Sequence, residues 1–251
     1  MGVGDTIQSV ERAAGILRLL ASGPRELGVA ELARAMELPK GTLHGILRTL
    51  VHVGFVEQDA TTGRYRLGGT LLHLGSSYLD VNELRTRSLN WADALAGRSR
   101  ESVWIGTLHE GGVLVVHHVF RPDDSMQVLQ VGTLLPAHAT ALGKVLLAYD
   151  PYGESAKEPL AAHTPATLVT ADALAKELEL VRGRGWAADL EELVEGEVSI
   201  AAPIRDRRAV TVGAIGVRGA VERLAEDGEP RRDLVSYVRD AARAITRDLS
   251  R

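Results

Sequence analysis

Residues 38–58, LPKGTLHGILRTLVHVGFVEQ, decide the fold of the N-terminal part of the chain. Pro39 suits the first turn of a helix, because the N–H group that it lacks would have no intrahelical partner there. The apolar residues that follow recur at helical spacing until Gly54, so the stretch predicts a helix over residues 40–53. Its apolar face carries Leu43, Ile46, Leu47 and Leu50. Its opposite face is short, polar and free of acidic groups, and it carries Gly41, His44, Gly45, Arg48 and His52.

The segments on either side of this helix complete a winged helix-turn-helix. Helical patterns cover residues 9–20 and 31–36, and two short strand-like runs, 55–58 and 64–67, follow with a polar tip between them. The polar face of the third helix allows close approach to phosphates and base edges. We therefore predict binding of double-stranded DNA, rather than a purely structural bundle or a dimerisation arm. The predicted contacts are Lys40, Gly41, Thr42, His44 and Arg48 on the helix and Arg64 on the hairpin.

The rest of the chain predicts a second, larger domain. Residues 1–68 form the predicted DNA-binding domain, residues 69–81 a linker helix, and residues 82–251 a C-terminal domain. The predicted fold class of the whole chain is α+β, with a mostly antiparallel sheet in the C-terminal domain. Strands are predicted at 103–109, 113–120, 126–131, 186–189, 198–204 and 210–218, and helices at 139–149, 171–184 and 231–249.

Composition narrows the function classes. The 251 residues are 45% hydrophobic and 25% charged, and no apolar run approaches the roughly 20 residues that a bilayer crossing requires. Because the chain starts without a secretory signal pattern, we expect a soluble cytoplasmic protein without membrane contact. The lack of cysteine excludes disulfides, thiolate zinc sites and cysteine nucleophiles. The net charge of -4 comes from the C-terminal part, since residues 1–75 hold eight basic and seven acidic residues.

Two local patterns in the C-terminal domain suggest anion binding. Residues 141–144, ALGK, resemble the end of a phosphate loop, but His138 replaces its first glycine and Val145 replaces its magnesium-binding hydroxyl. Residues 135–140 run directly into a helix whose free N-terminal amides can receive an anion. Alternatively, Thr140 simply caps that helix, and both interpretations stay open.

Two clusters of titratable residues suggest chemistry, and each has a structural alternative. His117 and His118 point to opposite faces of a strand, so they do not converge on a metal ion and are interpreted as structural. Asp189, Glu191 and Glu192 lack an accompanying nucleophile or metal set, so a catalytic role is not expected. We therefore predict no catalytic residue, no metal and no cofactor.

Several motifs are spread over nearly the whole chain. They are residues 9–13 (SVERA), 38–42 (LPKGT) with 54–56 (GFV), 136–144 (PAHATALGK), 185–192 (GWAADLEE), and 200–204 (IAAPI) with 213–215 (GAI). With these motifs the chain resembles the IclR family of bacterial regulators. The resemblance implies a GAF-like effector-binding domain, a homodimer or a dimer of dimers, and an operator with two-fold character.

The same resemblance implies where a small effector binds. Ser199 stands where cysteine is common in the family, and Gly216 and Arg218 stand where hydroxyl residues are common. In the DNA-binding domain, Gly45 stands where many members have arginine, so we do not assume the family's general operator. Carried over position by position, the family's effector pocket falls on Leu135, Ala141, Leu142, Asp189, Ser199, Gly216 and Arg218.

Residues 40–50, 116–125 and 219–224 are similar to members of the family that control glycerol catabolism in actinobacteria. This similarity implies a repressor with glycerol or glycerol 3-phosphate as inducer. Strand alternation predicts that Arg218 points inward, where an unpaired charge is costly. Asp189 or the anionic group of an effector would supply the partner, and a solvent-facing Arg218 is the alternative.

Two functional hypotheses follow. The first is a sequence-specific transcription regulator whose operator affinity changes with a small polar or anionic effector. It predicts a homodimer, because helix-turn-helix proteins read half-sites one helical turn apart, with apolar surface supplied by the first helix and by residues 71–79. The second is an enzyme built on the C-terminal domain with an accessory helical module, and the failed phosphate loop and missing cysteine weigh against it.

Overall fold

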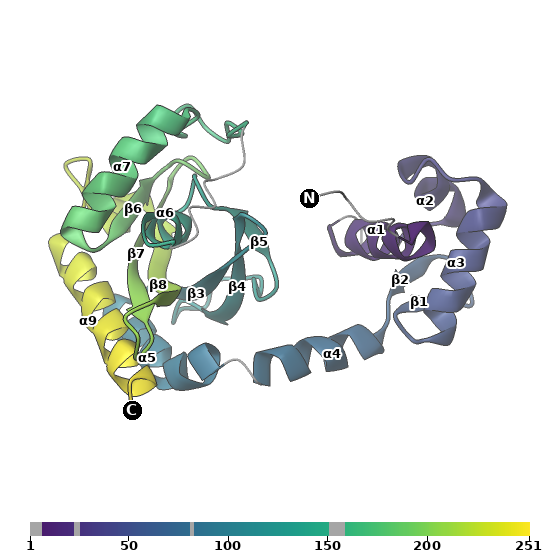
Figure 1. The fold of residues 1–251 in the computed structure, drawn as a ribbon, viewed down its shortest axis with the longest axis horizontal. Coiled ribbons are helices and arrows are strands. Elements are labelled where there is room, and N and C mark those ends of the chain that lie inside the picture. The colour runs from purple at the N-terminus through teal and green to yellow at the C-terminus, as the bar shows by residue number, and fades with distance from the viewer. Residues whose placement is uncertain (1–6, 23–25, 81–82, 151–158) are drawn as a thin grey trace. The chain divides into compact units, whose positions relative to one another are not determined.

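The computed structural model describes residues 7–22, 26–80, 83–150 and 159–251 (Figure 1). The chain divides into two compact units, residues 1–81 and 82–251. Each unit has a buried apolar cluster of its own, so each has the packing of an independent core. The further division of the first unit at residue 68 stays a prediction.

The first unit combines three helices with a two-stranded wing and a following helix. Its elements are α1 (Gln8–Ser22), α2 (Val29–Ala35), α3 (Lys40–His52), β1 (Val56–Gln58), β2 (Tyr65–Leu67) and α4 (Gly69–Asp80). The Oε2 atom of Glu31 accepts the N–H of Gly28 at 2.6 Å, which caps the start of α2. Leu27 and Tyr65 exchange backbone hydrogen bonds of 3.0 and 2.8 Å, so the segment before α2 joins the edge of the wing. Leu43, Leu47 and Leu50 anchor α3 in the core.

The second unit is a six-stranded antiparallel sheet with helices on both faces. Its main elements are α5 (Glu83–Ser99), β3 (Ser102–His109), β4 (Gly112–Val119), β5 (Leu134–Pro136), α6 (Ala141–Ala148), α7 (Ala171–Arg184), β6 (Ala187–Leu190), β7 (Glu197–Arg205), β8 (Thr211–Ala220) and α9 (Arg232–Leu249). The strand order is β5-β4-β3-β8-β7-β6. Helices α6 and α7 pack together on one side, while α5 and α9 pack together on the other (Figure 1). This arrangement confirms the predicted α+β class.

The predicted strand over residues 126–131 is wrong. Those residues form a loop in which Met126, Val128 and Leu129 are exposed. The Gln127 side chain accepts the Arg121 N–H at 2.7 Å and donates to the Arg121 carbonyl at 2.9 Å, so a polar turn takes the place of strand pairing. The edge of the sheet is formed instead by β5, which pairs with β4 and was not predicted.

Smaller elements near the C-terminus were also not predicted. They are α8 (Val221–Leu224) and a two-stranded hairpin of β9 (Ala225–Glu226) and β10 (Glu229–Pro230). Helix α9 follows them and buries an apolar face that includes Leu234, Val238 and Ile245. None of the helices in the described ranges combines the length and the apolar composition that a membrane crossing requires.

Candidate nucleic-acid interface and ligand pocket

The predicted contact face of α3 is open to solvent. Lys40, Gly41, Thr42, His44 and Arg48 are all exposed, because the leucines of the same helix take the buried side. A Cβ added at Gly41 would have no neighbour within 4 Å, and the same is true at Gly45. The helix surface around Arg48 therefore carries little side-chain bulk, which permits a phosphate or a base edge to approach the helix backbone.

Two residues of the wing complete a groove along this face. Gln58 of β1 and Tyr65 of β2 line it together with residues of α3, among them His44 and Arg48. The sequence analysis did not select Gln58 or Tyr65. Gln58 resembles an ordinary polar residue at the end of a strand, and Tyr65 resembles a core residue. Their pairing across the hairpin, Gln58 opposite Tyr65, brings them to the helix.

The wing arginines are already bound to carboxylates. Arg64 donates to Glu31 at 2.7 Å and to the carbonyl oxygen of Glu26 at 3.1 Å. Arg66 pairs with Glu57 at 3.1 Å and with Glu26 at 3.4 Å. These bonds hold the wing against the segment around α2. A DNA contact by Arg64 stays a prediction, and it requires the guanidinium to exchange these partners for phosphate.

A small pocket of about 20 Å³, which is room for about one water molecule, lies between the sheet and α6 in the second unit. Five of the seven residues predicted for an effector site line it: Leu135, Leu142, Ser199, Gly216 and Arg218. The remaining lining residues, which sequence reasoning did not assign to the pocket, are Trp104, Thr140, Ile200, Ala201 and Val217.

The register of three strands explains this grouping. Trp104 of β3 pairs with Gly216 of β8, which in turn pairs with Ala201 of β7. A Cβ at Gly216 would lie 2.5 Å from the carbonyl oxygen of Ile200, so only glycine fits at this close approach. The signal that would have found Trp104 is this pairing of a large aromatic residue opposite a glycine.

The other two predicted residues, Ala141 and Asp189, do not line the pocket, but both bond to Ser199, which does. The Ser199 hydroxyl donates to Oδ2 of Asp189 at 3.1 Å and accepts the N–H of Ala141 at 3.4 Å. Oδ1 of Asp189 accepts the N–H of Glu192 at 2.7 Å. Asp189 therefore orients Ser199, and through it the start of α6, rather than lining the pocket itself.

Buried charges lie next to this network. Lys144 has 1% of its side chain exposed and forms an ion pair with Oε1 of Glu192, whose Oε2 is buried without a hydrogen-bond partner in the described part of the chain. Burial raises the pKa of Asp189 above its usual value, while the Glu192 N–H and the Lys144 charge oppose the rise. Burial likewise raises the pKa of Glu192, opposed by Lys144.

Arg218 points inward as predicted, but Asp189 is not its ion-pair partner. Its Nε donates to Oε2 of Glu197 at 2.6 Å, and its guanidinium lies 5.1 Å from the centre of the Trp104 ring. Ser199 pairs with Arg218 in the sheet, so Glu197, two residues earlier on β7, occupies the diagonal position on the same face. The side chain is 17% exposed and is not the solvent-facing arginine of the alternative interpretation.

The start of α6 is capped by its own chain. The Thr140 hydroxyl accepts the N–H of Gly143 at 3.2 Å and donates to the carbonyl of Pro136 at 3.0 Å. With the Ala141 N–H directed at Ser199, two of the amides that were considered for an anion already have acceptors. Of the two interpretations, the structure favours the cap.

The histidine pair sits in a half-buried setting. Nδ1 of His118 accepts the N–H of Gln130 at 3.2 Å, and the ring contacts Trp104 and Phe120. Burial, together with the neighbouring His117, lowers the pKa of His118 to about 4. Over the residues that the structure describes, no group of three or more histidines and carboxylates could hold a metal ion.

A winged helix-turn-helix, together with a second unit that holds a pocket lined by polar and apolar side chains, is the architecture of ligand-responsive transcription regulators. Residues 9–60 match the model of the IclR helix-turn-helix domain, and residues 76–247 match that of the bacterial transcriptional regulator IclR C-terminal domain. The chain belongs to the IclR family. The family resemblance and the hypothesis of a DNA-binding transcription regulator are thereby confirmed, and the hypothesis of an enzyme is set aside.

Individual relatives cover nearly the whole chain. The Glycerol operon regulatory protein of Streptomyces coelicolor is 58% identical over 245 residues, which are 97% of this chain and 96% of that protein. The crystal structure of a putative transcriptional regulator from Rhodococcus sp. RHA1 superposes with a TM-score of 0.81 at 29% identity, covering 98% of this chain and 99% of that one. An IclR homolog from Microbacterium hydrocarbonoxydans, complexed with 4-hydroxybenzoate, gives a TM-score of 0.81 at 25% identity and covers 96% and 99%.

Proposed function

We propose that this chain is a cytoplasmic repressor of glycerol catabolism genes, induced by glycerol or glycerol 3-phosphate. The observation that carries the proposal is the 58% identity, over nearly the full length, to a protein named as the regulator of a glycerol operon. The cytoplasmic location follows from the proposed DNA partner, because operator DNA lies in the bacterial cytoplasm.

In the proposed DNA complex, the exposed face of α3 enters the major groove. Arg48 reads a base edge, while Lys40 and Thr42 position the helix on phosphate. His44 and the flat surface at Gly41 allow the helix to approach closely. The exposure of all five side chains or backbone positions supports these assignments.

In the proposed inducer complex, the pocket widens and the ligand lies between Trp104, Ser199 and Arg218. The Trp104 Nε1–H is buried and has no hydrogen-bond partner among the described residues, so it is free to donate to a ligand oxygen. The hydroxyl protons of Ser199 and Thr140 are donated to Asp189 and Pro136, so their oxygens serve as acceptors for the O–H groups of a polyol. A phosphate on the ligand would compete with Glu197 for the Arg218 guanidinium, which favours glycerol 3-phosphate over glycerol if the exchange occurs.

The proposed assembly is a homodimer that buries apolar surface of α1 and α4. Ile7 next to α1 and Val10 within it are 69% and 62% exposed, and Leu72 and Leu74 of α4 are 78% and 50% exposed. Isolated apolar side chains are normal on a surface, but four of them in or next to two helices of one small unit support a contact region. Light scattering at micromolar concentration tests the dimer, and a monomer that still binds operator tightly contradicts it.

A mobility shift on the gene's own upstream intergenic DNA tests the regulatory role. We expect a specific complex that is released by one of the two inducers and unaffected by unrelated sugars. Calorimetric titration of glycerol and glycerol 3-phosphate into the wild type and the Arg218→Ala variant then identifies the inducer. Equal affinity of both proteins for glycerol 3-phosphate would remove Arg218 from the proposed site.

A further inference from the structure

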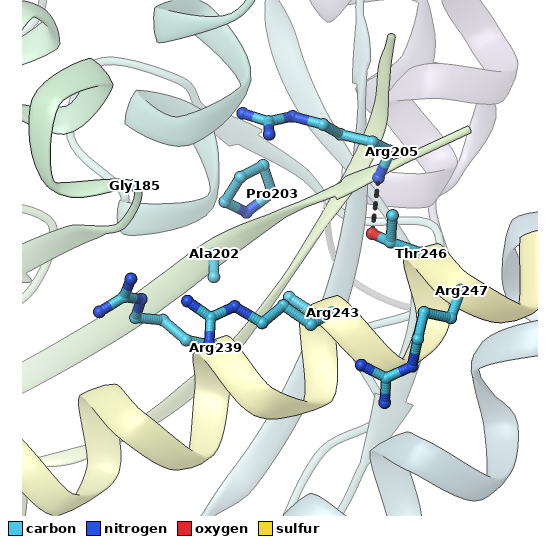
Figure 2. Close-up of a pocket in the computed structure, with 9 residues that line it drawn as sticks. Gly185, Ala202, Pro203, Arg205, Arg239, Arg243, Thr246 and Arg247 are labelled. Atoms are coloured by element: carbon cyan, nitrogen blue, oxygen red, sulfur yellow. Dashed lines mark hydrogen bonds between the residues drawn. The ribbon is translucent and has the colours of Figure 1, made fainter. Parts of the chain in front are cut away.

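A second concave region of the C-terminal unit shares no lining residue with the ligand pocket. It is an open groove of about 390 Å³ between the end of β7 and α9 (Figure 2). Four arginines line it: Arg205 from β7, and Arg239, Arg243 and Arg247 from α9. The three helical arginines are four residues apart, so they follow one face of α9 at intervals of about 6 Å.

These arginines lack close counter-charges, unlike several others of the same unit. Arg223, for example, donates to Glu101 at 2.5 and 3.0 Å. At the groove, the one ion pair that involves a lining arginine within the described residues joins Arg243 to Asp240 at 3.9 Å, and both side chains are more than half exposed. No carboxylate of the described chain lines the groove. Four arginines thus line one groove in a unit that is acidic as a whole, and the side chains of Arg239 and Arg243 extend along it in the same direction (Figure 2).

The walls of the groove are fixed before any ligand arrives. The Arg205 N–H donates to Oγ1 of Thr246 at 3.0 Å, which ties the end of β7 to α9 (Figure 2). The Arg205 guanidinium lies 4.8 Å from the centre of the Tyr149 ring. Pro203 and Ala202 form a floor of small side chains between the two walls (Figure 2). A preformed site loses less conformational freedom on binding than one that must assemble.

We propose that this groove binds the phosphate groups of an organic polyphosphate, as a second ligand site separate from the inducer pocket. The planar guanidinium fork matches phosphate oxygens with paired, charge-assisted hydrogen bonds. Arginines on two walls and along 12 Å of helix, by the rise of about 1.5 Å per residue, demand more than one anionic group. A chain of linked phosphates supplies several negative charges at short spacing, whereas a single carboxylate neutralises one arginine only.

Calorimetric titration of the full-length protein with inorganic pyrophosphate and with adenosine triphosphate tests the proposal. We expect both probes to bind the wild type, and the double variant Arg239→Gln/Arg243→Gln to bind pyrophosphate at least about tenfold more weakly for each guanidinium removed. Arg232→Gln is the matched control, because Arg232 is exposed on the same helix but does not line the groove. The Arg218→Ala variant should keep its pyrophosphate affinity, which separates the groove from the inducer pocket.

Three results would overturn the proposal. The first is no binding of either probe to the wild type. The second is equal pyrophosphate affinity in the wild type and the double variant, with thermal melting of the unliganded proteins showing that both are folded. The third is an effect of the double variant on binding of non-operator duplex DNA alone, which would make the groove a DNA contact and not a small-molecule site.

Discussion

Replacing Lys144 by methionine should destabilise the C-terminal unit strongly. Lys144 and Glu192 lie almost fully out of water, with 1% and 10% of their side chains exposed. Without the ammonium group, the Glu192 carboxylate keeps no partner for Oε1, and its Oε2 already has none among the described residues. Removing one member of a buried ion pair costs about 3–5 kcal/mol, because it leaves an uncompensated charge. That is a large share of the roughly 5–15 kcal/mol that holds a domain folded.

The matched variant removes both charges. In Lys144→Met/Glu192→Leu no buried carboxylate remains, and replacing a whole buried pair by apolar residues is often neutral or stabilising. The double variant should therefore be more stable than the single one. Urea unfolding followed by tryptophan fluorescence measures the second unit alone, since Trp91, Trp104 and Trp186 all belong to it.

The pH dependence of the single variant gives a second readout. Burial raises the pKa of the Glu192 carboxyl, and without Lys144 nothing opposes that rise. An acid whose pKa is higher in the folded than in the unfolded state destabilises the fold when ionised, so lowering the pH through the folded pKa restores stability. The deficit of Lys144→Met should shrink as the pH falls from neutral. Equal destabilisation of the single and double variants, or a deficit independent of pH, would refute the reasoning.

Three further predictions concern the DNA interface, the start of α6 and the histidine pair. Arg48→Ala should weaken operator binding by ~1–3 kcal/mol and reduce the base preference at one operator position. Lys40→Ala should lower by about one the slope of log affinity against log salt concentration. Fluorescence anisotropy at several salt concentrations measures both, and unchanged affinity and slope would contradict the two roles. Gly143→Ala should lower the melting temperature sharply, because its Cβ would lie 2.1 Å from the carbonyl oxygen of Ala137. A melting temperature equal to that of the wild type would show that α6 can shift to make room. Stability should fall as the pH drops from the ordinary histidine pKa to about 4, because the native state keeps His118 neutral; an NMR titration that shows His118 protonated near its usual pKa would argue against this.

Local patterns predicted most of the elements. Apolar spacing gave α3, since Leu43, Leu47 and Leu50 must share one side of a helix. Strand alternation placed Gly216 and Arg218 on one face of β8, and the structure brings both to the pocket. The winged helix-turn-helix followed from short-range order alone, because each of its elements is adjacent to the next in sequence.

The remainder depended on contacts between distant segments. Glu197 became the partner of Arg218 through the register of β7 on β8, and no spacing within either strand reports that register. Residues 126–131 include four apolar residues, which favoured a strand. In the structure the Gln127 side chain bonds to the backbone of Arg121, and these residues form a loop. The pattern of a single segment predicts the type of that element, whereas its place in a sheet depends on the neighbouring strands, which are distant in sequence.

The close approach of β7 to Gly216 bears on how this regulator can evolve. Because any Cβ at that position would lie 2.5 Å from the Ile200 carbonyl, Gly216 is closed to substitution unless the two strands move apart. Ser199 and Arg218 already carry side chains into the same space, and exchanging them leaves the backbone ladder intact. A lineage that acquires a new inducer can therefore change Ser199 and Arg218 without disturbing the sheet, whereas a hydroxyl residue in place of Gly216, as is common in the family, requires β7 and β8 to move apart.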